Sequence, residues 1–100
     1  MHLTVSFLRR LRAALRHDRV LVSAKALDEA LDDLQWERAD LLALLATLEA
    51  ADFERTERSV SRPSDRIWVF CPECERGTLW IRLVERADFL VISFHLAGEP

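Results

Sequence analysis

Hydrophobic side chains recur every three or four residues through the first half of the chain, the period of an amphipathic helix. This pattern predicts a first helix over residues 3–17 and a second over 24–34, which Ser23 can cap. A third helix is predicted over residues 37–49, where five leucines leave little polar face. We therefore expect this third helix to be the central and most buried one. The apolar stripe of the first helix consists of Leu3, Phe7, Leu8, Leu11, Ala14 and Leu15.

The pattern changes after Phe53 to strand-length runs rich in β-branched and aromatic residues. A short run of the same type, Val20–Val22, lies between the first two helices. Helices followed by strands predict an α+β fold, in which the N-terminal helices pack on one face of a small antiparallel sheet. One hundred residues are enough for one domain, spanning residues 1–100. The main strands are predicted at residues 54–59, 66–71, 78–84 and 90–95.

Alternation along the last two predicted strands separates two faces of the sheet. One face would carry the apolar side chains that pack against the helix at residues 37–49. The opposite face would carry an indole, a guanidinium, a hydroxyl and an imidazole, and we expect it to be open. That open face is the best candidate surface for function. The predicted core set is Leu79, Ile81, Leu83, Leu90, Ile92 and Phe94, and the open set is Trp80, Arg82, Ser93 and His95.

Composition and charge limit the possible classes of function. Half of the residues are hydrophobic and only 2 are Gly and 3 Pro, a composition typical of a globular domain. The net charge of −3 gives no general attraction for nucleic acid, so any such binding must rest on a local patch. The first basic residues follow the apolar N-terminal stretch, which is not the order of a secretory signal, and no apolar run approaches the ~20 residues of a membrane span. We expect a cytoplasmic protein with no membrane partner.

Cys71 and Cys74 form a single Cys-x-x-Cys pair. A structural zinc site needs four ligands, and the chain has no second cysteine pair, although His95 could supply one more ligand. A redox motif would normally open a helix, whereas this pair lies in a predicted hairpin loop. We therefore favour two thiols in a tight turn, and predict neither a metal nor a small-molecule cofactor.

Several short stretches follow one another in a familiar order and spacing between Val20 and His95. Together with the apolar helix that ends near Leu48, they resemble the MqsR-type toxins (motility quorum-sensing regulator family). The resemblance implies a RelE-like α+β fold, metal-independent cleavage of mRNA, and a cognate antitoxin protein as partner. The stretches are Ser-Ala-Lys-Ala-Leu (23–27), Ala-Asp-Phe (51–53), Val-Phe-Cys-Pro (69–72), Gly-Thr-Leu-Trp-Ile-Arg-Leu (77–83) and Leu-Val-Ile-Ser-Phe (90–94).

The resemblance also points to individual site residues. Three lysines of the family correspond to Arg55, Arg82 and His95, and the family's catalytic tyrosine corresponds to Trp80. The family's glutamine falls on an apolar residue, Ile67 or Val69 depending on the gap. The basic positions of the family are thus occupied by basic side chains here, while the glutamine and the tyrosine phenol are absent.

RNA can be cleaved without metal when its 2′-OH attacks the neighbouring phosphorus, which needs proton transfer and cations for the growing charge. His95 suits the acid or base role because imidazole holds both protonation states near neutral pH. Arg55 and Arg82 suit the phosphate, because a guanidinium is a permanently charged fork of donors. Trp80 could stack on a base, and Arg66, at the start of a predicted strand, is a second candidate for substrate binding.

Plainer interpretations remain open for each of these residues. His95 could be a half-exposed histidine at a strand end, the arginines could be solvated surface residues, and Trp80 could be covered by a loop or a partner. Three classes of function therefore compete. They are a ribonuclease toxin, a catalytically degenerate member of the same fold that binds RNA or a protein, and an interaction domain unrelated to toxins.

Overall fold

The computed structural model describes residues 2–98, which form three helices and six strands. The sheet has the strand order β1-β6-β5-β3-β2, with the short β4 paired to β5. β1 runs parallel to β6 and the other pairings are antiparallel, so the α+β prediction is confirmed but the sheet is mixed. The elements are α1 (His2–Arg16), β1 (Val20–Val22), α2 (Ala24–Leu34), α3 (Arg38–Leu45), a 3₁₀ turn (Ala50–Asp52), β2 (Phe53–Arg58), β3 (Arg66–Phe70), β4 (Glu73–Cys74), β5 (Gly77–Glu85) and β6 (Phe89–Leu96).

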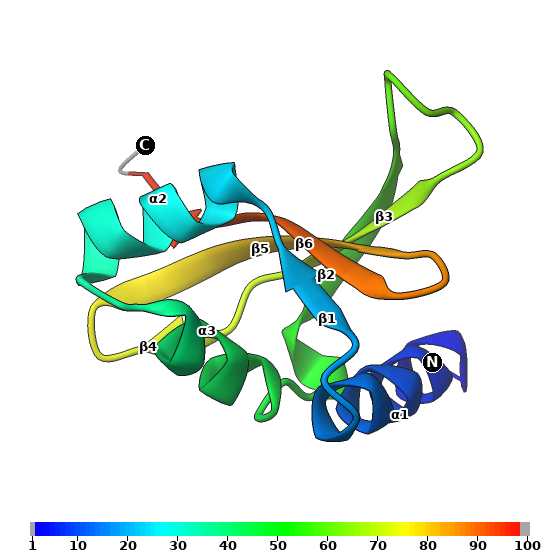
Figure 1. Cartoon of the computed structure of the whole chain (residues 1–100), viewed down its shortest axis with the longest axis horizontal. Helices are drawn as coiled ribbons and strands as arrows, with labels where there is room; N and C mark the ends of the chain where they lie inside the picture. The colour runs from blue at the N-terminus through cyan, green and yellow to red at the C-terminus, as the bar shows by residue number, and fades with distance from the viewer. Residues whose placement is uncertain (1, 99–100) are drawn as a thin grey trace.

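Helices α1 and α3 lie together on one side of the sheet, below it in the view of Figure 1. The core forms between them and the strands, and it is centred on Phe7 of α1, which is fully buried. The Phe7 ring stacks on Trp68 with centroids 4.2 Å apart and meets Phe89 edge-on at 5.4 Å. Aromatic pairs in this geometry stabilise the fold by more than the burial of their apolar area alone would. The packing of α1 thus fixes one face of the sheet as the core face.

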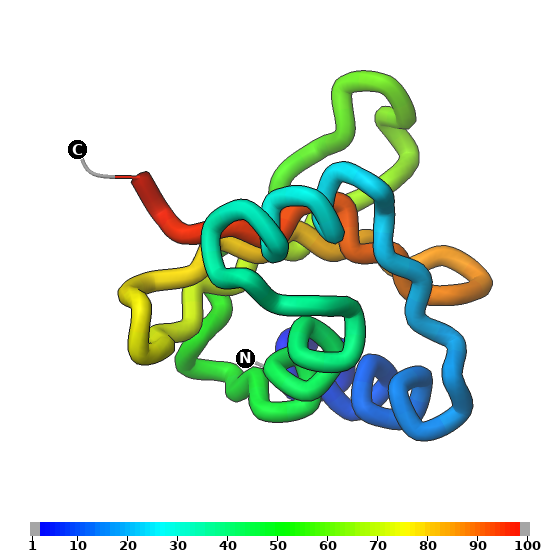
Figure 2. The backbone as a smooth tube through the Cα atoms, turned by 60° about the vertical axis from the view of Figure 1, so that its left-hand side comes forward, coloured from blue at the N-terminus to red at the C-terminus, as the bar shows by residue number. Residues whose placement is uncertain are grey.

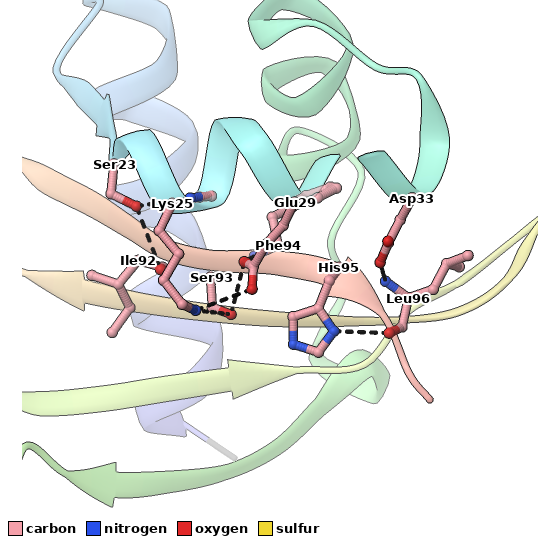
Figure 3. Close-up of polar contacts among 10 residues, drawn as sticks. Ser23, Lys25, Glu29, Asp33, Ile92, Ser93, Phe94, His95 and Leu96 are labelled. Carbon is pink, nitrogen blue, oxygen red and sulfur yellow. Dashed lines mark hydrogen bonds and ion pairs between the residues drawn. The ribbon is translucent and has the colours of Figure 1, made fainter. Parts of the chain in front are cut away.

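Helix α2 lies along the edge of β6 and not over the core face with α1 and α3 (Figures 1 and 2). Strand β1 pairs with only the first part of β6, through Val91. Beyond that point, the backbone N–H groups of Phe94 and Leu96 donate to the carboxylates of Glu29 and Asp33, at 2.9 and 3.0 Å (Figure 3). Side chains of α2 therefore take the place of a neighbouring strand and satisfy an otherwise open edge.

A β-bulge in β6 changes which residues face the core. Arg82 pairs with Ser93 but Leu83 pairs with Val91, so Ile92 is an extra residue in its strand. The extra residue reverses the alternation, and Val91 and Phe89 are buried while Ile92 is only half-buried. The prediction that Leu90 and Ile92 face the core was therefore wrong. It was right for Leu79, Ile81, Leu83 and Phe94.

The third helix is shorter and less buried than its leucine content predicts. It was expected over residues 37–49, but α3 ends at Leu45 after eight residues. It buries Leu41 and Leu45, while Leu42 is only partly buried at the margin of the core. The most buried helix is α1, so the central place that we expected for the third helix was wrong. The bounds of the other two helices and of the four main strands agree with the prediction to within one residue.

None of the helices that residues 2–98 form is long and apolar enough to cross a membrane.

Candidate functional site

The face of the sheet opposite α1 and α3, called the open face below, carries the polar side chains that the sequence singled out. Strand register sets their order. Arg55 of β2 lies across Val69 of β3 from Arg82 of β5, and Arg82 in turn pairs with Ser93 of β6. In the next row, Trp80 pairs with His95, the penultimate residue of β6. Residues distant in sequence are thus brought together, as alternation predicted.

The indole of Trp80 is covered by two guanidinium groups. The central guanidinium carbons of Arg55 and Arg82 lie 5.0 and 5.1 Å from the centre of the Trp80 ring, a cation–π geometry. The sequence suggested that this ring could stack on an RNA base. In the structure its contacts are with the arginines, so Trp80 holds the two cations in place.

Glu57 joins the same two arginines and was not identified from the sequence. Its carboxylate accepts from Nη2 and Nε of Arg55, at 2.7 and 3.0 Å, and from Nε of Arg82 at 3.1 Å. The hydrogen bond from Arg82, with that from Arg55, lowers the pKa of Glu57 against the opposing effect of burial. The carboxylate is therefore ionised at neutral pH and accepts from two N–H donors of Arg55 and one of Arg82. Its alternation with Arg55 on the strand predicted over residues 54–59 was the one signal in the sequence.

The imidazole of His95 is held in one orientation by the backbone. Its Nδ1 lies 2.8 Å from the carbonyl oxygen of Leu96 (Figure 3). A carbonyl only accepts, so Nδ1 carries a hydrogen and the lone pair of the neutral ring is on Nε2. Nε2 is then the atom that can take a proton from a bound molecule.

Lys25 extends from α2 toward the β6 side of the open face and was also missed as a site residue (Figure 3). Its Nζ lies 3.1 Å from the Glu29 carboxylate and 3.3 Å from Oγ of Ser93, which is 2% exposed. Partial burial works to raise the pKa of Glu29, but hydrogen bonds from the Phe94 N–H and from Lys25 outweigh it, and the pKa lies below its usual range. Lys25 is the only lysine of the chain, a signal that composition alone could have given.

Cys71 follows β3 at the margin of the open face, and both it and Cys74 are free, half-buried thiols. Partial burial and the nearby Glu54 raise the pKa of the Cys71 thiol, against the effect of Arg55 and Arg82. The thiol is thus protonated at neutral pH and a weak nucleophile. Within residues 2–98 no three His, Cys, Asp or Glu side chains lie together as a metal site would require.

Arg66 is not part of this group. It begins β3 opposite Arg58 of β2, and alternation places it on the same side as Trp68, which belongs to the core face. Its side chain is exposed. The structure therefore brings together four of the five predicted site residues, Arg55, Trp80, Arg82 and His95, and leaves Arg66 apart.

A scan of protein-family models and a search of curated proteins gave no match to this chain.

Proposed function

We propose that the open face is the RNA site of a cytoplasmic, metal-independent endoribonuclease, an mRNA-cleaving toxin paired with an antitoxin protein. The observation that carries the proposal is the meeting of Arg55, Arg82 and His95 from three different strands on the face of the sheet opposite α1 and α3. Two cations and one oriented imidazole are the groups that cleavage through the 2′-OH requires. The RelE-like fold and the antitoxin enter the proposal through the resemblance to the MqsR-type toxins.

In the proposed reaction, Nε2 of His95 takes the proton of the ribose 2′-OH while the 2′-oxygen bonds to the adjacent phosphorus. The bond from phosphorus to the 5′-oxygen breaks, and that oxygen takes a proton from solvent. The products are a 2′,3′-cyclic phosphate and a free 5′-OH. Arg55 and Arg82 stabilise the charge that grows on the phosphoryl oxygens, since guanidinium matches a phosphate with paired donors.

The phosphate competes with Glu57 for the two arginines, most directly at Arg55, which gives Glu57 two donors. Glu57 accepts three hydrogen bonds from them, so it acts as an internal competitor for the anion. Trp80 keeps the guanidinium groups in place while they change partners, because its cation–π contacts do not use their N–H donors.

A catalytically degenerate module that binds RNA or a protein is the second candidate. It is favoured by the same carboxylate, which forms ion pairs with both arginines, and by the absence of the family's glutamine and tyrosine from the corresponding positions, Ile67 or Val69 and Trp80. Such a module would bind through the open face without breaking the RNA chain.

Cleavage of a single-stranded transcript in EDTA separates the two candidates. We expect cleavage by the wild type and a loss on the order of 10²–10⁴ in rate for His95→Ala, because proton transfer is removed. The matched control is His17→Ala, which removes an exposed imidazole that follows α1. Binding without cleavage, or equal rates for wild type and His95→Ala, would remove the enzyme and leave the binding module.

A further inference from the structure

The basic side chains of the open face lie in an order that runs across the strands. Arg55 stands on β2 at one edge, Arg82 on β5, His95 on β6, and Lys25 on α2 beyond the other edge. We propose that Lys25 contacts a substrate phosphate and that single-stranded RNA crosses the sheet from β2 to α2. This inference rests on the proposed function and adds the path of the RNA and a residue to it.

Strand spacing gives the length of that path. Three spacings of about 4.8 Å separate β2 from β6, so the path from Arg55 to the β6 side is about 14 Å. Both guanidinium groups reach over Trp80 of β5, so they hold one part of such a segment, and Lys25 at the α2 end holds the strand on the other side of His95.

The contacts of Lys25 leave it able to bind an anion. An ammonium has three donors, and two of them are directed to Glu29 and Ser93. The Lys25 side chain is 66% exposed while that of Glu29 is 24% exposed. The carboxylate is turned toward the sheet edge by the Phe94 N–H and the Ser93 hydroxyl, so the ammonium lies on the solvent side of the pair. A phosphate can therefore reach Lys25 without displacing Glu29.

The test is the salt dependence of binding to a single-stranded DNA oligonucleotide, which has no 2′-OH and is not cleaved. Each phosphate contact contributes about 0.7 to the slope of log K against log[salt] for single strands. Lys25→Ala and Lys25→Gln should each reduce the slope by about 0.7. The affinity lost relative to wild type should therefore be roughly fivefold greater at 0.1 M salt than at 1 M. Lys25→Arg should restore the slope. Arg16→Ala, which removes an exposed cation at the end of α1, should leave it unchanged.

The outcomes separate this inference from the proposed function. If wild-type binding depends on salt and Lys25→Gln shows the same slope, the proposed contact of Lys25 with phosphate is overturned. The proposed function is then unaffected. A wild type that neither binds the oligonucleotide nor cleaves RNA would overturn the proposed function, and the path with it. If Lys25 served only to stabilise the fold, its substitution would lower the free energy of unfolding measured in urea. The slope of log K against log[salt] would then stay unchanged.

Discussion

Replacing Glu29 by alanine should destabilise the fold, because this side chain closes the uncovered part of the β6 edge. Its carboxylate accepts from the backbone N–H of Phe94 at 2.9 Å and from the Ser93 hydroxyl at 3.2 Å, and both of these residues are buried. A buried donor without a partner costs about 1–3 kcal/mol. We therefore expect Glu29→Ala to lower the free energy of unfolding by about 2 kcal/mol. Glu29→Gln keeps one acceptor oxygen and should lose about half as much.

Urea unfolding at pH 7 measures this loss as a lower midpoint with an unchanged slope. Asp32→Ala is the control, because it removes an exposed carboxylate from the same helix, and its effect should stay within about 0.5 kcal/mol. The pKa of Glu29 is lowered in the folded protein, so its contribution is present above the unfolded pKa and is lost as the pH falls through the folded one. The gap between wild type and Glu29→Gln should therefore close in acid. Equal effects of Glu29→Ala and Asp32→Ala would refute the reasoning.

Three further variants test the core, the arginine pair and the thiols. Ile81→Ala should lower the free energy of unfolding in urea by about 2–5 kcal/mol, since Ile81 is fully buried. Leu90 is half-buried, so Leu90→Ala should lower it by about 1 kcal/mol or less. A larger loss for Leu90→Ala than for Ile81→Ala would contradict the assignment of the core face. Glu57→Gln should tighten binding of single-stranded RNA in a titration, because it frees Arg55 and Arg82 from a carboxylate whose pKa is lowered; weaker binding would show that Glu57 orients them instead. Cys71→Ser with Cys74→Ser should leave folding and cleavage nearly unchanged, with no effect of chelator, whereas stoichiometric zinc in the purified protein would contradict this.

The secondary structure and four of the six residues of the predicted sheet core could be predicted from the sequence, because period and strand composition are local properties. The face of β5 was predicted correctly since Leu79, Ile81 and Leu83 alternate without interruption. The face of β6 was not, because the bulge at Ile92 depends on pairing with another strand. Amphipathic period likewise predicted α2 but not its place at the β6 edge, which Glu29 sets by a contact 65 residues away in sequence.

The candidate site was predictable as far as alternation reached. Trp80 and Arg82 lie on one strand at a spacing of two, so their common face follows from the sequence. The contacts of Glu57 with both arginines, and the reach of Lys25 over Ser93, depend on how β2 and α2 are placed by the whole fold. No local pattern carries that information.

The most direct test of the central claim compares one single-stranded sequence in two forms, as RNA and as the 2′-deoxy oligonucleotide, each incubated with the purified protein in EDTA. The account predicts that only the RNA is cut, that its fragments end in 2′,3′-cyclic phosphate and 5′-OH, and that His95→Ala abolishes the fragments while His17→Ala does not. Cleavage of both forms, fragments with 5′-phosphate ends, or intact RNA after prolonged incubation with wild type would contradict the claim that the open face cleaves RNA through its 2′-OH.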